Sequence, residues 1–304
     1  MISFRYHLVS IVAVFLALAL GIVVGTTALN GPITKDLRRQ VNDAKKQRDA
    51  LAQQVKGLQG QVDDAGQFAG TYGDQLVAGA LKDQKVVSIV LPGATSDMED
   101  GVAREVSAAG GHITAQVTLT KTYLDPSHGS AIVSLATTAH PIGWTAPETS
   151  DSAALGGSLL SYVLLGQGSA TDLTQVLAQF SELHMIETDG QQITPSKTVV
   201  VIGHGSLNPK DYASEAELAL VGALAKAGGH VVVAGDAGSA TSGGLVATVR
   251  SSNTDNAAVS TIDNADNASG QVSTVLALAG AVKNEVGHYG TAKGADALYP
   301  APLK

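Results

Sequence analysis

The residues that could perform chemistry are sparse in this chain of 304 residues. Ser206, His204 and Asp236 could form a nucleophilic triad, but the Gly-x-Ser-x-Gly elbow that exposes such a serine is absent. The chain has no cysteine, which excludes disulfides, thiolate catalysis and cysteine-based metal sites. Because no catalytic motif is recognisable, we expect a protein that is not an enzyme.

Potential metal ligands are dispersed in the same way. None of the eight histidines lies in a His-x-His pair or four residues from another histidine. Copper(I) sites rely on clustered cysteine, methionine and histidine, and His184-Met185 is the only adjacent pair of such ligands. His184, Met185 and His288 are therefore weak candidates for a metal site. No residue in the sequence is a candidate for binding a cofactor.

Glycine turns mark where a ligand would bind if the chain forms a parallel sheet. Three turns, at 92–94, 203–206 and 235–238, directly follow short apolar runs, and ligands bind at the carboxyl ends of such strands. None matches a nucleotide fingerprint, because the third glycine of Gly-x-Gly-x-x-Gly is missing and no Gly-Lys-Ser/Thr follows. Tight turns that require glycine for backbone reasons are the simpler interpretation.

The elements around these turns predict an α/β domain. β-Branched runs alternate with helical stretches in the order strand 86–91, helix 98–109, strand 113–119, and again strand 199–202, helix 214–227, strand 231–233. Both helices end in the tetrapeptide Ala-Gly-Gly-His, whose glycines stop a helix. We therefore expect a Rossmann-like, internally duplicated α/β domain with a largely parallel sheet. The remaining predicted elements are a helical insert at 154–185, a strand near 257–262 and a helix at 271–286.

The N-terminus predicts a single transmembrane helix. No Asp, Glu, Lys or Arg occurs from Tyr6 through Thr34, and the apolar run from Leu8 to Leu29 is long enough to cross a bilayer core of about 30 Å. A cleaved signal peptide is the alternative, since Arg5 precedes the run, but the apolar core of a signal peptide spans only about 7–15 residues. We expect an uncleaved anchor in the cell membrane.

The basic residues beside this helix point to a cytoplasmic domain. Arg5 precedes the helix, whereas Lys35, Arg38, Arg39, Lys45 and Lys46 follow it. By the positive-inside rule this bias would keep the large domain in the cytoplasm. Long translocated domains follow that rule poorly, so the count alone does not fix the topology.

A heptad pattern follows Gly31-Pro32, where we expect the membrane helix to break. The a positions hold Thr34, Val41, Arg48, Val55 and Val62, and the d positions hold Leu37, Ala44, Leu51, Leu58 and Ala65. About four to five heptads favour a coiled-coil stalk. An amphipathic helix packed on its own domain is the alternative.

Two signals indicate a parallel homodimer. Inside the membrane run, the small residues Ala13, Ala17, Gly21 and Gly25 repeat every four positions, which lets two helices approach closely in lipid. The heptads that follow would continue the same seam. Its candidate dimerisation residues in the stalk are Leu37, Val41, Leu51, Val55, Leu58 and Val62.

These patterns divide the chain into four segments. They are an anchor at 1–32, a stalk with a glycine-rich hinge at 33–73, the α/β domain at 74–295 and a tail at 296–304. A hydrophobic content of 44% suffices for a substantial core. The net charge of −8 and the isoelectric point near 5.4 argue against nucleic acid as a partner.

Both ends of the chain resemble one known family. The opening MISFRYHLVS at 1–10 and the ending GHYGT at 287–291 are similar to those of the actinobacterial MctB family, as is Ala109-Gly110-Gly111 leading into Val117-Thr118-Leu119-Thr120. The tail departs from the family pattern at two positions, Ala292 and Lys293. Lys293 stands where we expect the histidine of Gly-Thr-Gly-His-Gly.

The resemblance implies a function and a topology. Members are described as copper transport proteins of the envelope, so copper export or homeostasis, and copper itself, are implied by resemblance only. The large domain would then be extracytoplasmic. Aromatic residues at only 4% argue against the barrel that an outer-membrane pore would need. The alternative, suggested by corynebacterial relatives, is a non-enzymatic dimeric envelope or cell-division scaffold that docks a membrane or septal partner.

Overall fold

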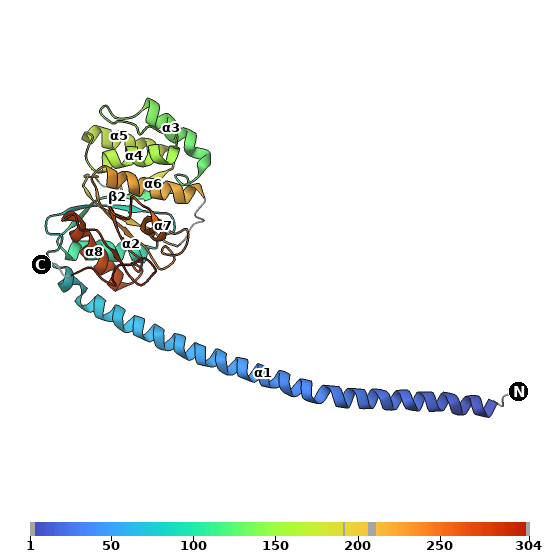
Figure 1. The fold of residues 1–304 in the computed structure, drawn as a ribbon. Coiled ribbons are helices and arrows are strands. Elements are labelled where there is room, and N and C mark those ends of the chain that lie inside the picture. Colours follow the sequence, from blue (N-terminus) through green and yellow to red (C-terminus); the bar gives the residue numbers. More distant parts are fainter. Residues whose placement is uncertain (1–3, 191, 206–210, 302–304) are drawn as a thin grey trace. The chain divides into compact units, whose positions relative to one another are not determined.

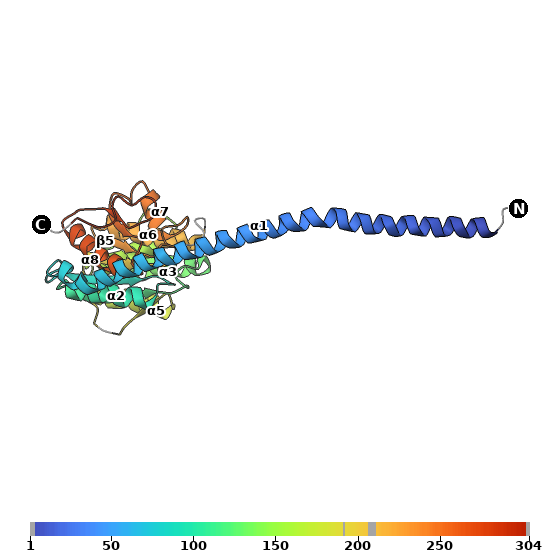
Figure 2. The ribbon, with the colours of Figure 1, turned by 90° about the horizontal axis from the view of Figure 1, so that it is seen from below.

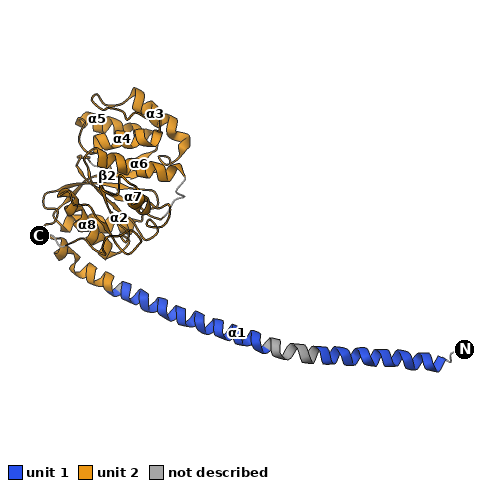
Figure 3. Ribbon diagram, in the orientation of Figure 1, with its two compact units in different colours: residues 1–64 blue, residues 65–304 orange. Residues whose placement is uncertain are grey.

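The chain forms two compact units. The computed structural model describes residues 4–190, 192–205 and 211–301, without the side chains of 26–34 and 63. The first unit comprises residues 1–64 and the second residues 65–304 (Figure 3). The first is helical, and the second contains a seven-stranded sheet covered by helices (Figure 1). The predicted mixed α/β fold with an N-terminal apolar helix is therefore confirmed.

Helix α1 runs from Phe4 to Val77 as one element. Its segment Phe4–Gly25 has a mean hydropathy of 2.9 and is the one helix segment of the described chain that is long and apolar enough to cross a membrane. The expected break at Gly31-Pro32 does not occur, because α1 continues through both residues. Long helix-forming segments on both sides propagate across a locally unfavourable position, since nucleation is the costly step.

Residues 66–73, which we expected to form a hinge, are helical as well. A Cβ atom at Gly73 would lie 2.8 Å from Cγ2 of Val272 and 3.3 Å from Oε2 of Glu105. A Cβ atom at Gly70 would lie 3.9 Å from that of Ala268. Val77, one turn further along α1, is fully buried. The last glycines of α1 therefore serve close packing on the domain instead of bending the chain.

The sheet has the strand order β3-β2-β1-β4-β5-β6-β7. Neighbouring strands are parallel except β2 and β3, which are antiparallel, so the predicted largely parallel sheet is confirmed. The strands are β1 Lys85–Val90, β2 His112–Leu119, β3 Ile186–Thr188, β4 Thr198–Ile202, β5 His230–Ala234, β6 Val259–Ile262 and β7 His288–Tyr289. The two edge strands, β3 and β7, were not predicted because three and two residues carry no readable pattern.

Helices cover both faces of this sheet. Helices α2 and α8 lie on one face, which is turned toward the viewer in Figure 2, and α3, α4, α5 and α6 lie on the other (Figure 1). The helices are α2 Ser96–Ala108, α3 Gly129–Thr138, α4 Ser152–Leu164, α5 Ala170–Glu182, α6 Tyr212–Lys226, α7 Leu245–Ser251 and α8 Ala268–Val282, with a 3₁₀ turn, η1, at Pro126–His128.

Strand β4 shows why its sequence is apolar without alternation. All five of its residues are buried. Val199 and Val201 join the core under α4, α5 and α6, whereas Val200 and Ile202 join the core under α2 and α8. A strand that is covered on both faces must be apolar on both, which gives the continuous β-branched run.

Matching turns end the two predicted βαβ helices. Ala109 and Ala227 are the C-caps of α2 and α6, and the next residues, Gly110 and Gly228, have φ of 80° and 82°. A left-handed backbone of this kind favours glycine. The repeated Ala-Gly-Gly-His sequence therefore builds the same turn into β2 and into β5.

Candidate functional site

The carboxyl edge of the sheet is the place where this fold would bind a ligand. From β1 the chain crosses to β2 on one side, and from β4 it crosses to β5 on the other. The direction of winding thus reverses between β1 and β4, which is where ligands bind in open α/β sheets. The glycine turns after β1, β4 and β5, singled out from the sequence, all lie at this edge.

A histidine and an aspartate meet beside that switch point. Nδ1 of His204 lies 2.9 Å from Oδ2 of Asp236. The other carboxylate oxygen, Oδ1, accepts hydrogen bonds of 2.9 Å from the backbone N–H groups of Gly205 and Ser239. Because a carboxylate can only accept, Nδ1 carries the hydrogen and Nε2 is the acceptor of the neutral ring. The aspartate side chain is 14% exposed and the histidine side chain 42%.

This pair contains two of the three residues that could form a triad. The structure brings His204 and Asp236 into contact. Ser206 lies outside the described residues. A carboxylate-oriented imidazole can take up or release a proton, or act as one ligand of a metal. In the part of the chain that is described, no three His, Asp or Glu side chains form a group that could hold a metal ion.

The switch point is acidic. Burial raises the pKa of Asp266, in the loop between β6 and α8, and the nearby carboxylates of Asp236 and Asp263 act in the same direction. The first turn of α2 carries Asp97 and Glu99. Burial also raises the pKa of Glu99, with Asp100 contributing. Carboxyl groups from three different loops and helices therefore gather along this edge of the sheet.

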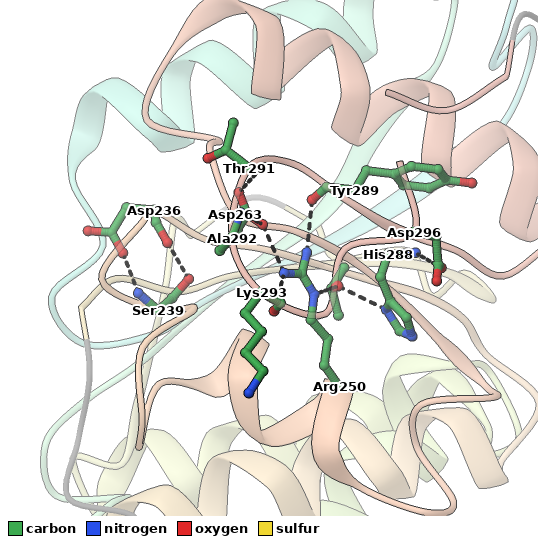
Figure 4. A network of polar contacts seen from close by, with 11 residues as sticks. Asp236, Ser239, Arg250, Asp263, His288, Tyr289, Thr291, Ala292, Lys293 and Asp296 are labelled. Carbon is green, nitrogen blue, oxygen red and sulfur yellow. Dashed lines mark hydrogen bonds and ion pairs between the residues drawn. The ribbon is translucent and has the colours of Figure 1, made fainter. Parts of the chain in front are cut away.

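A second polar network lies at the neighbouring part of this sheet edge (Figure 4). The guanidinium group of Arg250, on α7, donates to Oδ2 of Asp263 over 2.8 Å and to the carbonyl oxygen of Tyr289 over 2.9 Å. The side chains of Arg250 and Asp263 are 4% and 0% exposed. This buried ion pair joins α7, the end of β6 and the edge strand β7.

The C-terminal motif supplies the rest of that network. Oδ1 of Asp263 accepts from the backbone N–H of Thr291 over 2.8 Å, and Oδ2 accepts from that of Ala292 over 3.1 Å. A Cβ atom at Gly290, where φ is 127°, would fall 2.0 Å from Oδ1 of Asp263. Lys293 contributes its carbonyl oxygen, 3.4 Å from Nη1 of Arg250. The GHYGT ending thus ties the C-terminal segment to Asp263 and Arg250, and we call this network the C-terminal lock. Residue 293 contributes to it through its backbone carbonyl.

His288 belongs to this lock. Nδ1 of its ring is 2.9 Å from Oγ1 of Thr261, which itself accepts from Nε of Arg250, and Nε2 is 3.1 Å from the carbonyl oxygen of Asn256. The carbonyl can only accept, so Nε2 carries the hydrogen and Nδ1 accepts from the threonine hydroxyl. Burial lowers the pKa of His288, which keeps the ring neutral. Both ring nitrogens are therefore engaged within the protein.

The other metal candidates point to different places. His184 is exposed in a left-handed turn with φ of 54°, whereas the Met185 side chain is fully buried in the core. Neither is brought near His288 by any described contact. The structure therefore assembles no site from His184, Met185 and His288.

The candidate dimerisation residues are all accessible in the single chain. The stalk side chains Leu37, Val41, Leu51, Val55, Leu58 and Val62 are between 55% and 64% exposed. In the span, Ala13 and Ala17 are exposed, and nothing lies within 4 Å of a Cβ atom built at Gly21 or Gly25. These residues form no described contact that would occupy them.

Sequence analysis missed Arg250 and Asp263. Asp263 directly follows β6, as Asp236 follows Gly235 after β5, so a search for polar residues at every strand end would have found it. Arg250 has no such signal, since an arginine in the last turn of a short helix usually faces solvent. Only the fold reveals that it is buried.

Comparison with known proteins agrees with the resemblance of the two ends. The family profile described as "Copper transport outer membrane protein, MctB" matches residues 1–300. The copper transporter MctB of Mycobacterium bovis is 31% identical over 97% of this chain and 98% of its own length, and so is that of Mycobacterium tuberculosis. The Mycobacterium leprae protein of the same name is 29% identical over 98% of this chain and 99% of its own length. The chain therefore belongs to the MctB family.

Proposed function

We propose that this chain is a membrane-anchored component of copper transport. The observation that carries the proposal is the family match over residues 1–300, together with relatives named copper transporters that align over nearly their whole length. The apolar segment Phe4–Gly25 supplies the membrane attachment such a role needs.

Deletion of the gene in its host tests this function. Cells without the protein should accumulate more copper and stop growing at lower external copper, whereas their response to zinc should not change. Total cell copper, measured by mass spectrometry, gives the readout. Unchanged copper content and tolerance in the deletion strain would contradict the proposal.

We expect the purified protein to handle copper without a tight resident site. The reason is that His184, Met185 and His288 lie apart, with Met185 and His288 buried. In competition with a chelating probe, copper(I) should bind no better than to a generic histidine-bearing surface. One tight equivalent per chain, lost on His184→Ala, would contradict this expectation.

We further propose that residues 33–304 lie outside the cytoplasmic membrane. Family membership supports this orientation, and the basic residues after the span oppose it. Alkaline phosphatase fused after Lys304 should be active. An inactive fusion, paired with an active cytoplasmic reporter at the same position, would reverse the topology.

A second candidate function is a non-enzymatic homodimeric scaffold with a coiled-coil stalk. Its support is the row of exposed heptad residues on α1. Leu51→Asp with Leu58→Asp should convert the protein in detergent to a monomer by light scattering, because charges at d positions would be desolvated in the seam. Lys46→Asp with Gln53→Asp, at outward f positions, is the matched control. A wild-type monomer would refute the dimer.

A scaffold also requires a membrane or septal protein partner. Capture from host membranes with the anchor intact, compared between wild type and the Leu51→Asp, Leu58→Asp variant, tests for one. A partner recovered from a strain whose copper tolerance is unaffected by the deletion would favour the scaffold over transport.

We also infer that the two βαβ units arose by internal duplication. The support is the shared Ala-Gly-Gly-His sequence in matching turns, at 109–112 and 227–230.

A further inference from the structure

A cavity of about 700 Å³ lies beside helices α4 and α6 and is separate from the switch point. Its walls include the aromatic residues Trp144 and Tyr162 and the carboxylates Asp151, Glu215 and Asp255. Pockets that hold small ligands have volumes of about 300–1,000 Å³ and combine apolar walls with a few placed polar groups. Neither proposed function uses this cavity.

Asp255 gives the cavity a polar group that lacks a full set of partners. The residue is only 9% exposed. Its Oδ2 accepts from the hydroxyl of Ser252 over 2.6 Å and from that of Thr254 over 3.4 Å. Its Oδ1 accepts no hydrogen bond from any residue that the structure describes. Because Oδ1 itself is not enclosed, a donor inside the cavity can reach it.

Gly222 leaves that oxygen open toward the cavity. Gly222 lies on α6 and lines the cavity with Asp255. A Cβ atom there would lie 3.0 Å from Oδ1 of Asp255, so a side chain at this position would cover the carboxylate. The absence of one keeps the negative charge accessible from the cavity.

The aromatic wall is held in place. Nε1 of Trp144 donates to Oγ of Ser158 over 3.2 Å, and the ring of His140 packs against the indole with ring centres 5.5 Å apart. The indole is 7% exposed. An indole and carboxylates on the walls of one cavity suit a cation, because the ring face attracts positive charge.

The charges on the walls favour the same ligand. The cavity lining contains three carboxylates, on Asp151, Glu215 and Asp255, and one basic residue, Lys226. Oδ1 of Asp151, the N-cap of α4, also accepts from the backbone N–H of Ala153 in the first turn of that helix. We propose that this cavity binds an organic cation, whose ammonium or guanidinium group pairs with Asp255 and lies against Trp144. The cation belongs either to a free polyamine or to a basic side chain of a polypeptide.

The cavity contains its own reporter, because Trp144 is the chain's one tryptophan. The full-length protein in detergent is titrated with spermidine, with an end-blocked Gly-Lys-Gly peptide and with end-blocked Gly-Gln-Gly. We expect a saturable change in tryptophan emission with at least one cationic probe and none with the neutral peptide. The probe that binds more tightly identifies the source of the cation. No saturable change with either cation, or an equal change with Gly-Gln-Gly, would overturn the proposal.

Variants assign the binding to the cavity. Asp255→Asn should weaken binding about tenfold, because it removes a charge-assisted hydrogen bond while keeping the shape. Glu215→Gln, at an exposed position of α6, should weaken it about twofold without disturbing the fold. Glu182→Gln, on the exposed surface of α5 outside the cavity lining, is the matched control and should bind as wild type. Unchanged affinity in both Asp255→Asn and Glu215→Gln would place the ligand elsewhere.

Discussion

Helix α1 and the α/β unit place the same kinds of residue in opposite surroundings. Asp36 and Arg39 of α1 form an ion pair of 2.7 Å with side chains 66% and 72% exposed. Arg250 and Asp263 form one of 2.8 Å with side chains 4% and 0% exposed. The distances hardly differ, yet only the second pair is removed from water. The exposure of an ion pair to water, more than its contact distance, therefore decides what the pair contributes to the free energy of unfolding.

Apolar residues and glycines show the same contrast. Leu51 and Val55 of α1 are 59% and 64% exposed, whereas the valines of β4 are fully buried. A Cβ atom at Gly60 would meet nothing within 4 Å, whereas one at Gly73 would meet Val272 at 2.8 Å. Residues 4–25 and 35–62 of α1 thus expose their apolar side chains in the single chain, whereas the α/β unit buries most of its own.

Breaking the buried ion pair should have the largest effect. Asp263→Ala should lower the free energy of unfolding by about 3–5 kcal/mol, because Arg250 would be left buried without its partner. Denaturant unfolding followed by Trp144 emission measures this. Asp36→Ala, the matched change in α1, should lower it by less than about 0.5 kcal/mol. Equal losses in the two variants would refute the contrast.

Filling the packed glycine should destabilise the domain. Gly73→Val should cost about 1–3 kcal/mol of unfolding free energy, since Val272 and Glu105 must move to admit the side chain. The same denaturant titration gives the value, and Gly66→Val, where no atom lies within 4 Å of the added Cβ, serves as the control. A stability loss at Gly66 equal to that at Gly73 would mean that helix propensity, not packing, sets the cost.

Removing a buried charge should stabilise the protein in a pH-dependent way. Burial raises the pKa of Glu217, which is 7% exposed on α6, to about 7. The folded state then holds a proton that the unfolded state releases, so stability falls as pH rises from the ordinary carboxyl value of 4.5 to about 7. Glu217→Gln should raise the unfolding free energy at pH 8 by roughly 1–3 kcal/mol.

The pH dependence of this change is the sharper test. The gain in unfolding free energy should vanish at pH 4, where Glu217 is protonated in both the folded and the unfolded state. Glu215→Gln, two residues earlier on the exposed face of α6, should change little at either pH. A gain for Glu217→Gln that is the same at pH 4 and pH 8 would show that shape, and not charge, is responsible.

The smallest effect concerns the open glycines of α1. Gly60→Ala should stabilise the helix by about 0.5–1 kcal/mol, because alanine loses less backbone entropy and nothing obstructs its methyl group. Far-ultraviolet circular dichroism of the full-length protein at rising temperature should show later melting of the helical signal. Earlier melting would mean that the glycine is needed for a contact with another chain.

Some elements could be predicted because their residues carry the whole signal. Strands β1, β4 and β5 are runs of β-branched residues, and the span is a run without charge. The edge strands β3 and β7 exist through pairing with neighbours, as when Thr261 and Ile262 of β6 align with His288 and Tyr289. The hinge prediction failed because glycine permits close helix packing as readily as it permits bending.

For the candidate sites, the sequence determined which residue types are available, and the tertiary structure decided which of them contact one another. The charge-free run of α1, the missing cysteines and the glycine turns at strand ends follow from residue order alone, because they depend on local chemistry. The pairing of His204 with Asp236, the burial of Arg250 against Asp263 and the cavity at Trp144 join residues from different elements of the fold. Such contacts arise only when the sheet sets its strand order, since chain separation says nothing about which strand ends become neighbours.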